Sequence, residues 1–222
     1  MTKPTIGVLI LNTSFPRIIG DIGNPASFDY PTIYHTIETA TTATVVTHQV
    51  LAPRIESDIE AAALSLAATP VSVITTSCGF LSPLQNRLAQ LTQVPVITSS
   101  LTLIPLLTAW YGHTEKLGVI TFDKSRLHSR HLGNHAPVAI EGLQNNDSLK
   151  KTISQDLPDL DREQAAQEVL AACDRLTNNF PAVKALILEC TNLSPYKSEI
   201  RSHTGLSVYD IVDAVHWLLR SG

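Results

Sequence analysis

Short runs of apolar, β-branched residues alternate along the chain with longer runs in which apolar side chains recur at helical spacing. The first pattern predicts strands and the second predicts helices. The strand pattern occurs at Ile6–Asn12, Thr44–Leu51, Val71–Thr76, Val94–Thr98, Leu117–Phe122, Val138–Leu143, Val183–Leu188 and Leu206–Tyr209. The helix pattern is clearest at Glu56–Ala68, Glu163–Asn178 and Ile211–Leu219, whereas 144–161 is polar and resembles a loop or a domain edge. This alternation predicts an α/β fold with a mainly parallel sheet covered on both faces.

The chain also repeats itself. Residues 71–98 align without a gap on residues 183–210, at the 112-residue separation of Cys78 and Cys190. The identical pairs include Cys78 with Cys190, Leu81 with Leu193, Ser82 with Ser194, Pro83 with Pro195, Thr92 with Thr204 and Val96 with Val208. A nearly equal shift places IGVLILN over LGVITFD. We therefore expect two pseudo-symmetric α/β halves, 1–111 and 112–222, with the last helix of the first half able to cross to the other half.

Each copy of the repeat reads strand, cysteine, two variable residues, Leu-Ser-Pro, helix. Ser-Pro is a helix-start pattern, so each cysteine is expected at the carboxyl end of a strand, just before a helix N-terminus. Open α/β sheets bind ligands there, and the helix N-terminus attracts anions. The same field lowers the pKa of a thiol, so we expect at least one of Cys78 and Cys190 to titrate below the usual value of about 8.5. We expect the two thiols to face each other across one small-molecule site.

Two like groups on opposite sides of a site suit a particular reaction. Inverting a stereocentre by proton transfer needs a base on one face and an acid on the other, and the roles exchange in the reverse direction. Cys78 and Cys190 fit this requirement better than any other pair in the sequence. The repeat thus favours a catalytic pair over two buried structural cysteines.

Bulk composition narrows the class of protein. The chain has 222 residues, 44% of them hydrophobic and 16% charged, which argues against disorder. Its net charge of -4 gives no basic surface for nucleic acid. The apolar stretch Ile6–Leu11 is too short for a signal peptide or a membrane span, and no other stretch is long enough to span a bilayer. The sequence therefore predicts a soluble, cytoplasmic protein with neither a nucleic-acid nor a membrane partner.

The cysteines and histidines offer little for a metal or a disulfide. An odd count of three cysteines in a reducing compartment predicts free thiols, and Cys173 on the apolar stripe of a helix predicts a core residue. Neither cysteine motif has the Cys-x-x-Cys spacing of a zinc site. His128, His131 and His135 are clustered on an expected solvent face, and we expect no metal there. The sequence has no glycine-rich phosphate loop and no lysine in a pyridoxal setting, so no cofactor is expected.

The motifs TTSCGF and LECTNL, with a first strand ending in LNTS, resemble those of the aspartate/glutamate racemase superfamily. The resemblance covers essentially the whole chain in order and spacing. It implies a cofactor-independent enzyme of two pseudo-symmetric domains with the site between them, and a possible homo-oligomer. In such enzymes the two cysteines, here Cys78 and Cys190, are acid and base at the α-carbon of an amino acid or small carboxylate. The substrate-binding residues that the resemblance implies are Asn12, Thr13, Gly79, Phe80, Thr191 and Asn192.

The motifs also depart from those of glutamate racemases. Those enzymes usually have Asn-Thr after the first cysteine, where this chain has Gly79 and Phe80, and Thr-His after the second, where it has Thr191 and Asn192. Asn12 replaces the usual acidic residue. Fewer charged groups are thus expected in the site, and Phe80 favours a less polar substrate than glutamate. Arylmalonate decarboxylase keeps only the second cysteine, so Cys78 argues against that activity.

Three classes of function stay open at this point. The first is a racemase or epimerase acting by two-base proton transfer. The second is another cysteine-dependent reaction on the same scaffold, such as maleate isomerisation or the racemisation of a hydantoin. The third is a non-catalytic protein that binds a small acid. The paired cysteines favour the first two over the third.

Overall fold

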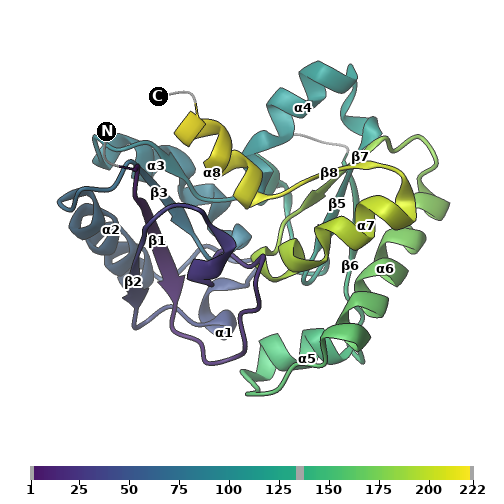
Figure 1. Cartoon of the computed structure of the whole chain (residues 1–222), viewed down its shortest axis with the longest axis horizontal. Coiled ribbons are helices and arrows are strands. Elements are labelled where there is room, and N and C mark those ends of the chain that lie inside the picture. Colours follow the sequence, from purple (N-terminus) through teal and green to yellow (C-terminus); the bar gives the residue numbers. More distant parts are fainter. Residues whose placement is uncertain (1–2, 134–137, 221–222) are drawn as a thin grey trace.

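Two four-stranded parallel sheets form the framework of the protein (Figure 1). The structure is a computed structural model and describes residues 3–133 and 138–220. In the first sheet the strand order is β2-β1-β3-β4, with β1 at Ile6–Leu11, β2 at Thr32–Ile37, β3 at Val73–Thr76 and β4 at Val96–Ile97. In the second the order is β6-β5-β7-β8, with β5 at Leu117–Thr121, β6 at Ala139–Gly142, β7 at Ala185–Leu188 and β8 at Ser207–Tyr209.

Helices cover both sheets, as expected for parallel strands that are buried on both faces. The α-helices that follow strands of the first sheet are α1 (Thr42–Val45), α2 (Pro53–Ala67), α3 (Gln85–Leu91) and α4 (Ile104–Tyr111). Those of the second are α5 (Ser148–Gln155), α6 (Arg162–Asn179), α7 (Lys197–Thr204) and α8 (Ile211–Arg220). The 3₁₀ helices are η1 (Pro25–Ser27), η2 (Gly79–Leu84), η3 (Ser100–Leu103), η4 (Thr114–Lys116), η5 (Ser129–Leu132) and η6 (Thr191–Tyr196).

The internal duplication predicted from the sequence is confirmed. The strand orders of the two sheets become identical when four is added to each strand number of the first sheet. The 3₁₀ helices η2 and η6, and the starts of α3 and α7, are related by the same 112-residue shift as the two cysteines. The protein therefore consists of two pseudo-symmetric α/β halves, as its fold class was predicted to be.

Two sequence-based assignments need correction. The strand expected over Thr44–Leu51 does not form, because Thr41 and Thr44 cap each other's backbone N–H groups and start the short helix α1 instead. The strand that pairs with β1 at the edge of the sheet is β2, whose side chains are mostly half-buried. Because β2 contains Tyr, His and Thr, it lacks the continuous apolar run by which the other strands were predicted. The polar stretch 144–161 contains the helix α5.

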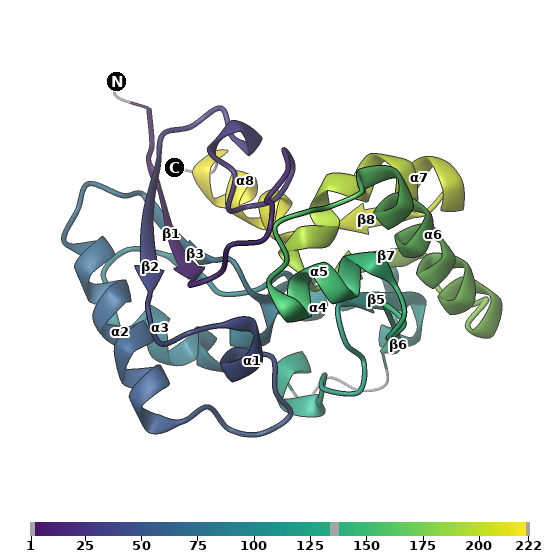
Figure 2. The same cartoon turned by 90° about the horizontal axis from the view of Figure 1, so that it is seen from below.

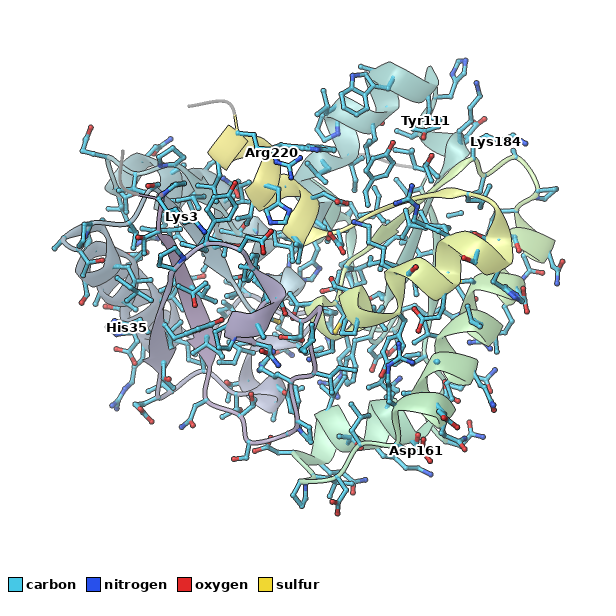
Figure 3. All side chains as sticks on the ribbon, viewed as in Figure 1. Lys3, His35, Tyr111, Asp161, Lys184 and Arg220 are labelled. Atoms are coloured by element: carbon cyan, nitrogen blue, oxygen red, sulfur yellow. The ribbon has the colours of Figure 1, made fainter. Side chains whose placement is uncertain are left out.

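The halves exchange their last helices. Helix α8 contacts β3 and β4 of the first sheet, and its Ile211 and Val215 share an apolar cluster with Ile6, Val8 and Val73. Helix α4 in turn contacts β5 of the second sheet. In Figure 3 Arg220, at the end of α8, lies on the side of Lys3, and Tyr111, at the end of α4, lies on the side of Lys184. This crossing holds the two halves together at their interface, which we call the seam.

The long loop between β1 and β2 crosses the seam as well. Figure 2 shows it running beside the segment that joins α5 to α6. There the Asp156 side chain accepts hydrogen bonds from the backbone N–H groups of Ser14 and Phe15, at 2.6 and 2.9 Å. Further along, Gly20 has a φ of +105° and lies so close to Pro195 that a β-carbon would come within 2.7 Å of the proline Cα. The loop is therefore fixed against the second half.

None of the helices within residues 3–133 and 138–220 combines the length and the apolar character needed to cross a membrane.

Candidate active site

Both cysteines of the repeat line one small pocket, with a cavity volume of about 20 Å³. The pocket lies where the carboxyl ends of β1, β3, β5 and β7 meet, so both sheets and the β1–β2 loop contribute to it. Its lining residues are Leu11, Phe15, Arg17, Thr42, Val46, Ser77, Cys78, Gly79, Phe80, Phe122, Ile153, Glu189, Cys190 and Asn192. The carboxyl-terminal edge of a parallel sheet is where α/β proteins bind ligands.

Cys78 and Cys190 occupy equivalent positions in the two halves. Each is the residue just before a 3₁₀ helix, and each is buried, at 8% and 9% exposure. The backbone N–H of Phe80 donates to Cys78, and the backbone N–H of Asn192 donates to Cys190. The Cys190 thiol also lies 3.5 Å from Oδ1 of Asn192. Each sulfur thus has a donor two residues ahead of it that would stabilise a thiolate.

The ionisation of the thiols differs from the sequence-based expectation. Burial, with a further contribution from the nearby Glu189 carboxyl, raises the pKa of Cys78 to about 12. The same two causes raise the pKa of Cys190 well above its ordinary value. The expectation that at least one thiol titrates below about 8.5 is therefore wrong. The helix-terminal N–H groups act in the expected direction, but desolvation of the thiolate outweighs them.

Glu189 is the residue that the motif analysis overlooked. It is 1% exposed, and its Oε2 accepts a 2.6 Å hydrogen bond from the Thr121 hydroxyl and a 3.4 Å bond from the Phe122 N–H. Burial raises the pKa of this carboxyl to about 7. Its Oε1 lies against Gly79, since a β-carbon there would come within 2.4 Å of it. Glu189 therefore joins the loop of Cys78 to that of Cys190.

Gly79 is consequently required for close approach of the halves. A β-carbon at this position would also lie 2.2 Å from the backbone oxygen of Glu189. The glycine that replaces the usual polar residue after the first cysteine thus makes room for a carboxyl from the other half. The pocket is more charged than the residues after each cysteine indicate. The additional charge comes from Glu189, which precedes the second cysteine.

Arg17 brings the opposite charge into the pocket. Its Nη1 forms a 3.1 Å ion pair with the buried Asp21, and its Nη2 donates to the Thr13 hydroxyl at 3.2 Å. The guanidinium also lies 4.7 Å from the centre of the Phe15 ring. Oδ2 of Asp21 accepts a 2.6 Å hydrogen bond from Asn192. A chain of contacts therefore runs from Arg17 in the β1–β2 loop to the residue that flanks Cys190.

The predicted substrate-binding residues divide into two groups. Gly79, Phe80 and Asn192 line the pocket with the cysteines. Thr13 lies behind the pocket and holds Arg17. The role of each in substrate binding stays a prediction.

Asn12 and Thr191 are engaged elsewhere. Asn12 is exposed at the end of β1 and donates to the Glu38 side chain at 3.0 Å. Thr191 is buried and donates to the Ser77 carbonyl at 3.0 Å, which fastens the two cysteine loops to each other. Substrate contact by these two residues likewise stays a prediction.

The Ser-Pro motif behaves differently from a helix cap. Ser82 and Ser194 lie inside η2 and η6, and the α-helices begin afterwards, at Gln85 and Lys197. The Ser82 hydroxyl donates to the His131 carbonyl at 2.8 Å, which is again a bond across the seam. The Ser-Pro pair therefore lies inside a 3₁₀ helix rather than at the start of a helix, and the motif forms part of the junction between the halves.

The remaining titratable candidates lie outside the pocket. The three cysteines are free thiols, and Cys173 is fully buried in α6 as predicted. His131 is buried beside Phe80, with ring centres 5.0 Å apart, rather than on a solvent face, and burial lowers its pKa to about 4. His128 is exposed, and His135 lies outside the described residues. Within the described ranges no group of His, Cys, Asp and Glu side chains is arranged to hold a metal ion.

Comparison with solved structures identifies the architecture. A cysteine-for-glycine mutant of arylmalonate decarboxylase superposes with a TM-score of 0.66 at 16% identity, covering 99% of this chain and 94% of that one. A glutamate racemase from Bacillus anthracis superposes with a TM-score of 0.59 at 16% identity, covering 100% and 84%. The chain has the racemase fold. The fold that the motifs implied is thus confirmed, although likeness at this identity says nothing of the reaction.

Sequence relatives carry a different name from these racemase-fold structures. A dimethylsulfoniopropionate lyase of Durusdinium sp. clade D is 28% identical over 226 residues, which cover 97% of this chain and 74% of that protein. Dimethylsulfoniopropionate lyase 7 of Emiliania huxleyi is 26% identical over 97% of this chain, which spans 66% of its length. A search against models of known protein families finds no match.

Proposed function

We propose that this protein is a cysteine-dependent enzyme that removes the proton next to the carboxylate of a small substrate, and that the reaction is a β-elimination of the dimethylsulfoniopropionate type. The observation that carries the proposal is the shared pocket of Cys78, Cys190 and Arg17. The relatives named as dimethylsulfoniopropionate lyases support the choice of elimination over racemisation. The substrate and the reaction are proposals for this chain.

Arg17 is the group suited to bind the carboxylate. It reaches the pocket wall already oriented by Asp21 and Thr13, so little side-chain entropy is lost when a ligand binds. A guanidinium forms paired, charge-assisted hydrogen bonds to a carboxylate. Fixing the carboxylate there would present the adjacent carbon to the thiols further along the wall.

The elimination balances without a cofactor. A thiolate takes a proton from the carbon next to the carboxylate, and the electrons of that C–H bond form the C=C bond. The C–S bond to the sulfonium breaks, and its electrons leave on sulfur. The products are acrylate, dimethyl sulfide and a protonated thiol, which returns its proton to solvent. One positioned base is sufficient for this reaction, and such a base contributes about 10²- to 10⁴-fold.

Racemisation is the second candidate, because two equivalent thiols line the one pocket. Both reactions begin with loss of the same proton. They differ in the need for the second cysteine, since inversion uses it as the acid whereas elimination does not.

The deciding experiment incubates the protein and its Cys78→Ser and Cys190→Ser variants with dimethylsulfoniopropionate and, separately, with a panel of amino and hydroxy acids in deuterated water. We expect release of dimethyl sulfide by the wild type, measured in the headspace, and at least about a 10²-fold loss in one variant, with a smaller loss in the other. Cys173→Ala, which removes a thiol outside the pocket, is the control. If dimethyl sulfide is absent and deuterium enters the α-carbon of an amino acid in a manner that needs both cysteines, the protein is a racemase.

A further inference from the structure

Glu189 is a buried carboxyl that has no basic partner among residues 3–133 and 138–220. It shares the pocket wall with both thiols, and its described hydrogen bonds come only from Thr121 and Phe122. Among the described residues no Lys, Arg or His forms an ion pair with it, and Arg17 is instead paired with Asp21. A carboxylate in such surroundings is costly unless a ligand supplies the opposite charge.

Two phenylalanines line the pocket together with this carboxyl. The Phe122 N–H donates to Oε2, and Phe80 follows Gly79, against which Oε1 lies. Phe80 and Phe122 both belong to the residues that line the pocket. A carboxylate next to two phenylalanine rings has the composition of sites that hold quaternary cations, because the rings attract the charge while their apolar surface covers the alkyl groups.

We propose that Glu189, Phe80 and Phe122 form a subsite for the onium group of a zwitterionic substrate, with Arg17 binding its carboxylate. This inference rests on the proposed function for the binding of the substrate carboxylate. It adds the residues that would select substrates with an onium group at the other end. The two charged residues reach the pocket from different halves, Arg17 from the β1–β2 loop and Glu189 from the end of β7. A small ligand with both charges would therefore bridge the seam beside the two thiols.

Occupation of the subsite would also change the thiols. The Glu189 charge contributes to the raised pKa of both cysteines. A bound cation offsets that charge and favours the thiolate. The substrate would thus promote ionisation of its own base.

The test compares two probes of the same shape. In 3-(trimethylammonio)propionate the head group is a cation, and in 4,4-dimethylpentanoate a carbon replaces the nitrogen. Binding of each is measured by calorimetry at pH 5 and pH 8, in the wild type, in Glu189→Gln and in the control Glu163→Gln, which removes a charge from the exposed surface of α6. Of the charged or titratable groups, Cys78, Cys190 and Arg17 line the same pocket as Glu189. Asp21 pairs with Arg17, and His131 and Lys150 contact the rings of Phe80 and Phe122.

We expect the wild type and Glu163→Gln to prefer the cationic probe by at least about tenfold at pH 8, and by less at pH 5, where Glu189 is protonated. Glu189→Gln should lose most of the preference and its dependence on pH. A preference that survives in Glu189→Gln, or a wild type that binds both probes equally or binds neither, would overturn the subsite. Because binding is read without turnover, a Glu189-dependent preference in a protein that releases no dimethyl sulfide would refute the proposed reaction and leave the subsite standing.

Discussion

Replacing Glu189 by Gln should make the protein more stable at neutral pH, and the gain should depend on pH. In the folded protein burial raises the pKa of this carboxyl from its ordinary 4.5 to about 7. Between those values the native state binds more protons than the unfolded chain, so the free energy of unfolding falls as the pH rises. The loss is complete above about pH 7, where the ionised form is buried in the native state.

The size of the effect follows from the two pKa values. At about 1.4 kcal/mol per pH unit, their difference corresponds to about 3 kcal/mol between pH 4.5 and pH 7. Gln has nearly the same shape and keeps an oxygen that can accept from Thr121 and Phe122, but it does not ionise. The stability difference between Glu189→Gln and the wild type should therefore grow by about 3 kcal/mol over this range, or roughly 6–12 °C in Tm for a protein of this size.

Urea unfolding at pH 5, 6, 7 and 8 under reducing conditions measures this difference, with Glu163→Gln as the surface control. The range stops at pH 8 because ionisation of thiols in the unfolded chain would add a second dependence above it. A difference between Glu189→Gln and the wild type that stays constant from pH 5 to pH 8 would mean that Glu189 titrates normally. The account of its burial, and of its effect on the thiols, would then be wrong.

Two further outcomes follow from the same contacts. Gly79→Ala should destabilise the protein by about 1–3 kcal/mol in denaturant unfolding, because the added carbon meets the Glu189 backbone oxygen at 2.2 Å; unchanged stability would show that the loops can separate at no cost. Alkylation of Cys78 and Cys190 by iodoacetamide at pH 8, followed by peptide mass spectrometry, should be slower than in the urea-unfolded chain and faster in Glu189→Gln than in the wild type; rapid alkylation of the folded wild type would contradict the raised pKa values.

Much of the framework could be predicted from the sequence because its signals are local or internally repeated. Seven of the eight strand segments it predicts are present, and buried strands such as β1 and β7 are continuous apolar runs. The edge strand β2 was missed because its partly exposed face needs no apolar residues. The 112-residue shift between Cys78 and Cys190 revealed the internal duplication. The duplication in turn predicted one site shared by two equivalent thiols.

The chemistry of the pocket was decided by tertiary contacts. Glu189, next to Cys190 in the sequence, reaches across the seam to Gly79, and Arg17 enters from a loop that Asp156 and Pro195 of the second half hold in place. Both contacts join residues far apart in the chain, so no local pattern shows them. The ionisation of the thiols depends on burial as well, and burial belongs to the assembled halves. A motif gives the identity and spacing of its residues, whereas desolvation and the approach of charges arise only when the chain has folded.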